Sequence, residues 1–177
     1  YGPCIIFLLL VILIFVNKSP ATPSTMNNSV AGDIPTLKQN VPEFALSAES
    51  FTSVFVSKNG EEKILIEKEK NKELPIASIT KLMTALVASE QYKVEDIVTI
   101  SKGSLLVKGV SGVYREGDSF LFSDTLRAML IASHNELANA LAEKIGANTF
   151  VDLMNKKSLG LGLLNTGFVN PIGTDPD

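Results

Sequence analysis

An unbroken apolar segment near the start of this sequence limits which part of the chain can form a globular domain. Residues 5–16 read IIFLLLVILIFV, and no charged residue precedes Lys18. A helix of this length spans roughly 18 Å, which is less than the hydrocarbon core of a bilayer, about 30 Å thick. Because the segment has no polar face and starts at Tyr1, we interpret residues 1–16 as an N-terminally truncated membrane anchor or the hydrophobic region of a signal peptide.

A polar stretch follows, in which Pro, Ser, Thr and Asn dominate residues 17–43. Its apolar side chains are isolated and fit no amphipathic period, so it buries too little surface to offset the entropy of the chain. We therefore expect a linker over residues 17–43 and a globular domain over residues 44–177. This order predicts an extracytoplasmic protein that is either exported or held at a membrane by its N-terminal segment.

Composition excludes several kinds of site. The 177 residues include one His, His134, and one Cys, Cys4. A zinc site built on His and Cys ligands is therefore excluded, as is an intramolecular disulfide. The net charge of −3 provides no basic surface for nucleic acid. We expect no metal, no cofactor and no nucleic-acid partner.

Within the globular part, a hairpin precedes a mostly helical region. Asn59-Gly60 lies between two stretches rich in β-forming residues, a strong signal for a β-hairpin. Apolar residues then recur at helical spacing over residues 78–90. Further helices are predicted near 123–130, 135–145 and 149–159, with strand-like pieces at 97–100 and 119–122. This order predicts a mixed α/β (α+β) domain, in which the hairpin alone is too small a sheet to be stable.

Ser78 and Lys81 form a Ser-x-x-Lys sequence at the start of the first predicted helix. Residues i and i+3 share one face of a helix, so the hydroxyl and the amino group can meet there. Desolvation makes a lysine lose its proton more readily, and the N-terminus of a helix favours a developing oxyanion. The pair can therefore provide a nucleophile and its base, although a capping Ser beside a surface Lys has the same spacing.

Ser133-His134-Asn135 is a second candidate, because it falls between two predicted helices. A break between buried helices can aim Ser and Asn side chains into a cleft. The other Ser-x-Asn of the sequence, Ser57-Lys58-Asn59, is already explained by the hairpin turn.

The surroundings of these residues resemble the D-alanyl-D-alanine carboxypeptidases, which are the low-molecular-mass penicillin-binding proteins. The similar blocks are PIASITKLMTA at 75–85, LIASHNELANALAE at 130–143, FVDLMN at 150–155 and TGFVNPIG at 166–173. The resemblance covers residues 51–177, in order and without large gaps. It implies a fold like that of β-lactamases and DD-peptidases, an antiparallel sheet with a helical subdomain, incomplete here at the C-terminus.

The resemblance also implies roles for four residues. Ser78 would be the acylated nucleophile, with its backbone N–H as half of the oxyanion hole, and Lys81 would accept its proton. Ser133 would relay a proton to the leaving amine, and Asn135 would hydrogen-bond the substrate amide and Lys81. The substrate would be a peptidoglycan stem peptide that loses its terminal D-alanine, and β-lactams would be inhibitors.

Two features depart from the family pattern. His134 stands where the family usually has a small residue, and we expect its side chain to point away from Ser78. No Lys-Thr-Gly follows, although the family places one on a later strand. We therefore expect the sequence to be a fragment that is inactive alone.

Two alternatives share this fold. A class A β-lactamase requires a Glu that activates the deacylating water, and residues 160–177 contain none. A non-catalytic, membrane-tethered relative that binds the cell wall would be favoured if the intact protein had no Lys-Thr-Gly. The sequence leaves open whether the activity is that of a carboxypeptidase, an endopeptidase or a transpeptidase.

Overall fold

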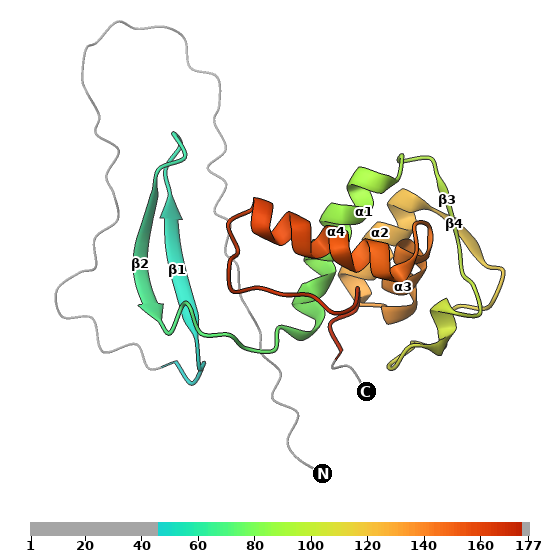
Figure 1. Ribbon diagram of the computed structural model, residues 1–177, viewed down its shortest axis with the longest axis horizontal. Coiled ribbons are helices and arrows are strands. Elements are labelled where there is room, and N and C mark those ends of the chain that lie inside the picture. The colour runs from blue at the N-terminus through green and yellow to red at the C-terminus, as the bar shows by residue number, and fades with distance from the viewer. Residues whose placement is uncertain (1–45, 175–177) are drawn as a thin grey trace, which may run out of the picture. The chain divides into compact units, whose positions relative to one another are not determined.

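The computed structural model describes residues 46–174, which divide into two compact units (Figure 1). The first unit ends at Lys72 and the second begins at Glu73. The predicted anchor and linker, residues 1–16 and 17–43, lie outside the described residues. Within the described part, no helix is both long enough and apolar enough to cross a membrane.

The first unit is the predicted β-hairpin. Strand β1, Phe51–Val56, pairs antiparallel with strand β2, Glu62–Lys68. Gly60 adopts a φ of +82° in the connecting turn, a backbone conformation that glycine reaches without strain. No third strand joins the pair among the described residues, and Val56 is 57% exposed. The hairpin is therefore confirmed, and apolar side chains on both of its strands are exposed.

The second unit is built on four helices and one small sheet. The helices are α1 Thr80–Gln91, α2 Phe122–Ala132, α3 Asn135–Glu143 and α4 Ala147–Gly160. Strands β3, Ile97–Thr99, and β4, Ser119–Leu121, pair antiparallel, as Figure 1 shows. All four helices and both strand-like pieces predicted from the sequence are present. Their boundaries differ from the predicted ones by at most two residues.

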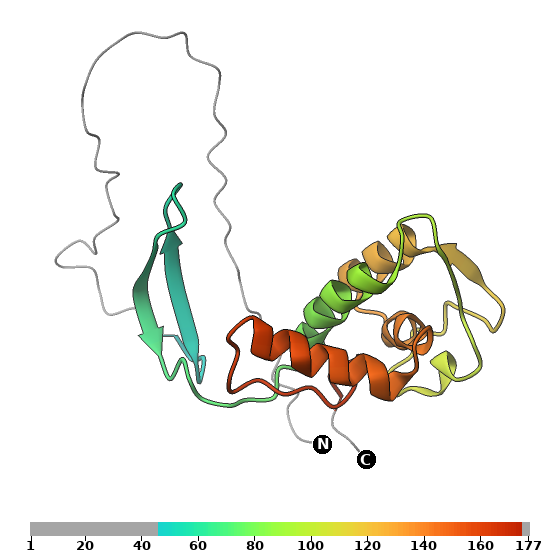
Figure 2. The ribbon, with the colours of Figure 1, turned by 45° about the horizontal axis from the view of Figure 1, so that its top comes forward.

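Helix α3 forms the centre of this unit, and the other three helices pack against it. Figure 2 views α3 almost along its axis, beside α4. Leu137 and Leu141 of α3 are fully buried, together with Met129 of α2 and Met154 of α4. Leu137 and Leu141 are four residues apart, a spacing that places both on the same face of α3 and that face in the core. The rigid core then fixes the start of α1 and the junction between α2 and α3.

Candidate active site

Ser78 lies in a short 3₁₀ turn, η1, Ala77–Ile79, that leads directly into α1. Ala77 has a φ of +45°, a left-handed conformation that costs a residue with a Cβ roughly 1–2 kcal/mol. Strain of this kind is typical of functional turns. It brings Ser78 to the first turn of the helix, where backbone N–H groups lack intrahelical partners.

The amino group of Lys81 meets the hydroxyl of Ser78, as their spacing predicts. Lys81 Nζ donates hydrogen bonds to Ser78 Oγ at 3.1 Å and to the carbonyl of Ile172 at 3.2 Å. Lys81 is only 2% exposed, and this burial lowers its pKa, while the negative charge of Glu136 opposes the shift. A lysine in such surroundings gives up its proton more readily and can act as a base.

Ser78 lies outside the buried face of its helix. Thr80, Lys81 and Thr84 of α1 are buried, but Ser78 itself is exposed. The reason is that the 3₁₀ turn precedes the packed face of α1, so that Lys81 reaches outward from the core to the hydroxyl. The pair thus combines an accessible hydroxyl with a desolvated amine.

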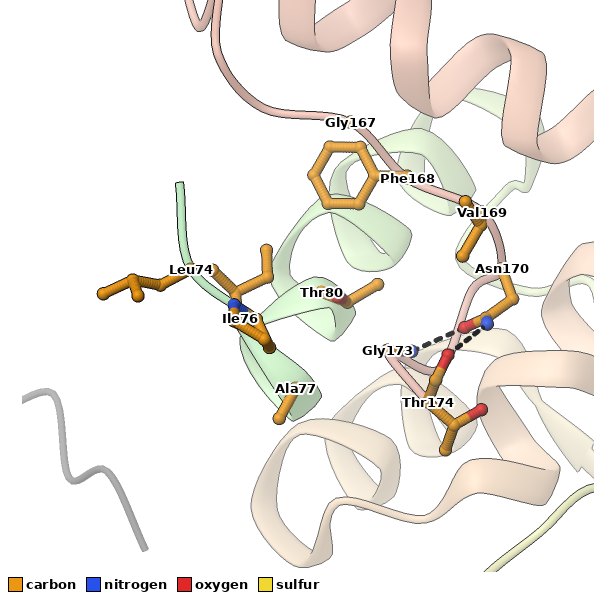
Figure 3. Close-up of a pocket in the computed structure, with 11 residues that line it drawn as sticks. Leu74, Ile76, Ala77, Thr80, Gly167, Phe168, Val169, Asn170, Gly173 and Thr174 are labelled. Atoms are coloured by element: carbon orange, nitrogen blue, oxygen red, sulfur yellow. Dashed lines mark hydrogen bonds between the residues drawn. The ribbon is translucent and has the colours of Figure 1, made fainter. Parts of the chain in front are cut away.

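A turn over residues 168–174 provides the second hydrogen-bond acceptor of Lys81, the carbonyl of Ile172. Within it, Asn170 Oδ1 accepts the backbone N–H groups of Ile172 and Gly173 at 3.1 and 2.7 Å, and Asn170 Nδ2 donates to Thr174 O at 2.7 Å. Figure 3 shows the bonds to Gly173 and Thr174. One carboxamide therefore fixes the turn that presents the Ile172 carbonyl to Lys81.

Two further contacts fasten this turn to the helices. Thr84 of α1, fully buried, donates its hydroxyl to the carbonyl of Pro171 at 2.6 Å. Asn155 of α4 makes two hydrogen bonds to the backbone of Phe168, at 2.8 and 2.9 Å. Sequence analysis assigned no role to Asn155, Asn170 or Thr84. Asn155 and Thr84 act through contacts distant in sequence, and Asn170 shapes a turn that meets Lys81 only in the folded chain.

Gly173 packs closely against the 3₁₀ turn that carries Ser78. A Cβ at Gly173 would lie 2.0 Å from the carbonyl oxygen of Ala77 and 2.7 Å from the hydroxyl oxygen of Thr80. Its φ of +81° also lies in the left-handed region. Only glycine satisfies both conditions, so the final Gly of TGFVNPIG fixes the backbone immediately before Ser78.

A cavity of about 150 Å³ lies between these two turns (Figure 3). Ala77 and Thr80 line one side, and Phe168, Val169 and Asn170 are among the residues on the other. Ser78 is not among the lining residues. The cavity therefore borders the 3₁₀ turn at Ala77 without being lined by Ser78 or Lys81.

The junction between α2 and α3 carries the second candidate motif. Ser133 ends α2 in the left-handed conformation, with φ 58° and ψ 34°, and is exposed. Asn135 begins α3, and its Nδ2 donates to the carbonyl of Lys108 at 2.7 Å and, more weakly, to that of Gly109 at 3.4 Å. In the described residues no hydrogen bond joins Asn135 to Lys81, so the convergence of Ser133 and Asn135 on Ser78 stays a prediction.

His134 lies at the same junction and contacts other residues. Its ring meets the ring of Tyr114 edge-on, with centroids 5.1 Å apart and planes at 89°. Its Nδ1 lies 4.0 Å from Oε1 of Glu136. No contact with Ser78 is present among the described residues.

Glu136 is a site residue that sequence analysis missed. It is fully buried, and its Oε1 accepts hydrogen bonds from the backbone N–H of Ser111, at 2.9 Å, and from the Ser111 hydroxyl. Its Oε2 has no hydrogen-bond partner. Burial favours the neutral acid, but the bonds from Ser111, the helix backbone and nearby His134 outweigh it, so the pKa of Glu136 is lowered. The sequence signal that could have identified Glu136 was an acidic residue on the apolar face of a predicted helix.

Comparisons with known proteins show the family and the fold of this chain. A profile of the D-alanyl-D-alanine carboxypeptidase family matches residues 38–177. Over 118 residues, 63% of its length, the chain is 36% identical to the D-alanyl-D-alanine carboxypeptidase DacF of Bacillus subtilis. Over 171 residues, 94% of its length, it is 31% identical to a D-alanyl-D-alanine endopeptidase of Pseudomonas aeruginosa. It spans 30% and 52% of the length of these two relatives.

A solved structure shows the same fold. Penicillin-binding protein D2 of Listeria monocytogenes, in its cefotaxime-bound form, superposes with a TM-score of 0.64 and 29% identity. The match covers 77% of this chain and 57% of that one. It confirms the expected fold, like that of the β-lactamases and DD-peptidases. From the family match and this likeness in fold we conclude that the chain belongs to the D-alanyl-D-alanine carboxypeptidase family of penicillin-binding proteins.

Proposed function

We propose that the intact protein is a serine-type D-Ala-D-Ala carboxypeptidase that shortens peptidoglycan stem peptides through an acyl-enzyme at Ser78. The observation that carries this proposal is the 3.1 Å hydrogen bond between the accessible Ser78 hydroxyl and the buried amino group of Lys81. A serine hydroxyl is a weak nucleophile until an adjacent base takes its proton. Membership of the family supports the same reaction.

The reaction proceeds in two halves. Lys81 takes the proton of Ser78 as Oγ attacks the carbonyl carbon of the penultimate D-alanine, and the backbone N–H of Ser78 stabilises the resulting oxyanion. The C–N bond then breaks, and the terminal D-alanine leaves after its amine receives a proton. In the second half, water attacks the Ser78 ester, which releases the shortened peptide and restores the hydroxyl.

Ser133 and Asn135 are proposed to serve the leaving group and the substrate. Ser133 relays the proton from Lys81 to the departing amine. Asn135 has its Nδ2 engaged by the carbonyl of Lys108, which leaves its Oδ1 to accept the substrate amide N–H. Because Nδ2 already has a partner and Oδ1 can accept one, the carboxamide of Asn135 is suited to binding substrate.

The partners and location follow the same proposal. β-Lactams acylate Ser78 because their ring amide resembles the D-Ala-D-Ala amide, and the related Listeria protein was solved with cefotaxime bound. Peptidoglycan lies outside the bacterial cytoplasmic membrane. Residues 1–16 as anchor or signal segment, 17–43 as linker and 44–177 as part of the catalytic domain would place Ser78 there.

A second candidate is the endopeptidase reaction, in which the same acyl-enzyme forms on a cross-linked peptide. The Pseudomonas aeruginosa relative, which is named an endopeptidase, aligns with 94% of the chain, and this match supports the endopeptidase reaction as the second candidate. The comparisons do not favour a β-lactamase or a non-catalytic wall-binding protein.

Release of D-alanine distinguishes these two reactions. We expect the full-length protein to release one D-alanine from each stem pentapeptide, because the terminal residue is its leaving group. Free D-alanine is measured with D-amino-acid oxidase, and Ser78→Ala, which lacks the nucleophile, serves as the control that releases none. Cleavage of a cross-linked dimer without release of D-alanine from the pentapeptide would support the endopeptidase instead.

A further inference from the structure

Among the described residues, two ionisable side chains are buried, and they carry opposite charges. Lys81 of α1 is 2% exposed and Glu136 of α3 is fully buried. The two helices pack against each other. A charge inside a protein is costly unless an opposite charge or hydrogen bonds compensate for it. The opposite charges of these two residues can therefore compensate each other.

The hydrogen bonds of Glu136 satisfy only half of its carboxylate. Oε1 receives both donors of Ser111, whereas Oε2 is buried with no hydrogen-bond partner. The carboxylate interacts electrostatically with three ionisable groups: His134, whose Nδ1 lies 4.0 Å from Oε1, Tyr114 and Lys81. Of these, Lys81 is the buried cation.

We propose that Glu136 is a positioning residue for the proposed reaction, acting as the buried countercharge of Lys81 and anchoring Ser111 beside Asn135. The inference rests on the proposed function, because it takes Lys81 as the base. The anchor extends over residues 108–111, which lie between η2, Ser104–Leu106, and β4, since Glu136 accepts from Ser111 while its neighbour Asn135 donates to the carbonyl of Lys108. The first turn of α3 therefore binds this segment, and it also carries the charge of Glu136 that acts on Lys81.

The countercharge determines the pH at which Lys81 becomes a base. Lys81 must be neutral to take a proton, so acylation rises with pH as the amine loses its own proton. A negative charge at Glu136 favours the ammonium form and raises the pKa of Lys81, opposing the larger effect of burial. Removing that charge lowers the pKa of Lys81, so the acid limb of the pH–rate profile moves to lower pH.

The test is the acylation rate of the full-length protein with a fluorescent penicillin, measured across pH for the wild type and Glu136→Gln. Glutamine keeps an oxygen for Ser111 and removes the charge. The matched control is Glu143→Gln, on the same helix, where the carboxylate accepts a hydrogen bond from Ser104 at 2.8 Å. We expect the acid limb to move to lower pH in Glu136→Gln and to stay in place in Glu143→Gln.

Other outcomes would overturn the inference. A limb that keeps its position in Glu136→Gln while the plateau falls would reduce Glu136 to a structural role, and an equal shift in Glu143→Gln would point to overall charge. Should Glu136→Gln fail to fold, Glu136→Asp retains the charge, and its limb is expected to match the wild type; a shifted limb would contradict the proposal. Wild-type protein that is never acylated would contradict the proposed function itself.

Discussion

Replacing Gly173 with alanine is expected to lower the free energy of unfolding by about 3–5 kcal/mol, from a left-handed backbone that disfavours a Cβ and from a steric clash. The new Cβ would lie 2.0 Å from the carbonyl oxygen of Ala77, well inside van der Waals contact. The backbone before Ser78 must then move, so acylation should fall as well. Chemical denaturation and penicillin labelling of the full-length protein measure the two effects.

Gly162→Ala is the matched control for this variant. Gly162 has a φ of +76°, close to that of Gly173, but no atom lies within 4 Å of the position of its Cβ. It therefore reports backbone strain alone, with an expected cost of about 1–2 kcal/mol and normal labelling. Equal losses of stability in the two variants would show that the close approach to Ala77 has no special importance.

Lys81→Met is expected to reduce the rate of acylation by about 10²- to 10⁴-fold, the usual contribution of a positioned base. Methionine retains the apolar stem of the side chain and removes the amino group. The substitution also removes the bond to the Ile172 carbonyl and the proposed countercharge of the buried Glu136, so the free energy of unfolding should fall by about 3–5 kcal/mol. Stopped-flow acylation and thermal melting of the full-length protein provide both quantities.

Lys93→Met, just beyond the end of α1, is the control for this substitution. Lys93 is exposed, and its side chain has no role in the proposed chemistry. Its acylation rate should equal that of the wild type. A Lys81→Met variant that acylates as fast as Lys93→Met would exclude Lys81 as the base.

Local signals in the sequence were enough to predict the elements of the fold. Asn59-Gly60 specifies a turn that β-branched residues flank, and the hairpin forms there. Apolar residues at helical spacing predict the first helix, because that spacing is what places one face in the core, and capping residues and glycines mark the ends of the others. The contact between Ser78 and Lys81 was equally predictable, since it arises within one turn of helix.

Contacts between distant segments were not predictable in this way. Asn170 organises its turn through its own neighbours, but the purpose of that turn is visible only where Ile172 meets Lys81, 91 residues away. Glu136 gave a local signal, an acid on an apolar helix face, but its partner Ser111 lies 25 residues earlier. The 3₁₀ turn that leaves Ser78 exposed depends on the close packing of Gly173 against Ala77.

The central claim, that Ser78 is the nucleophile, is tested most directly by locating the acyl group. The full-length protein is incubated with a penicillin, digested and analysed by mass spectrometry. We expect the adduct on the peptide that contains Ser78, and no adduct in Ser78→Ala, whose stability should change by less than about 1 kcal/mol because Ser78 is exposed. An adduct on another residue, or one that persists in Ser78→Ala, would contradict the account.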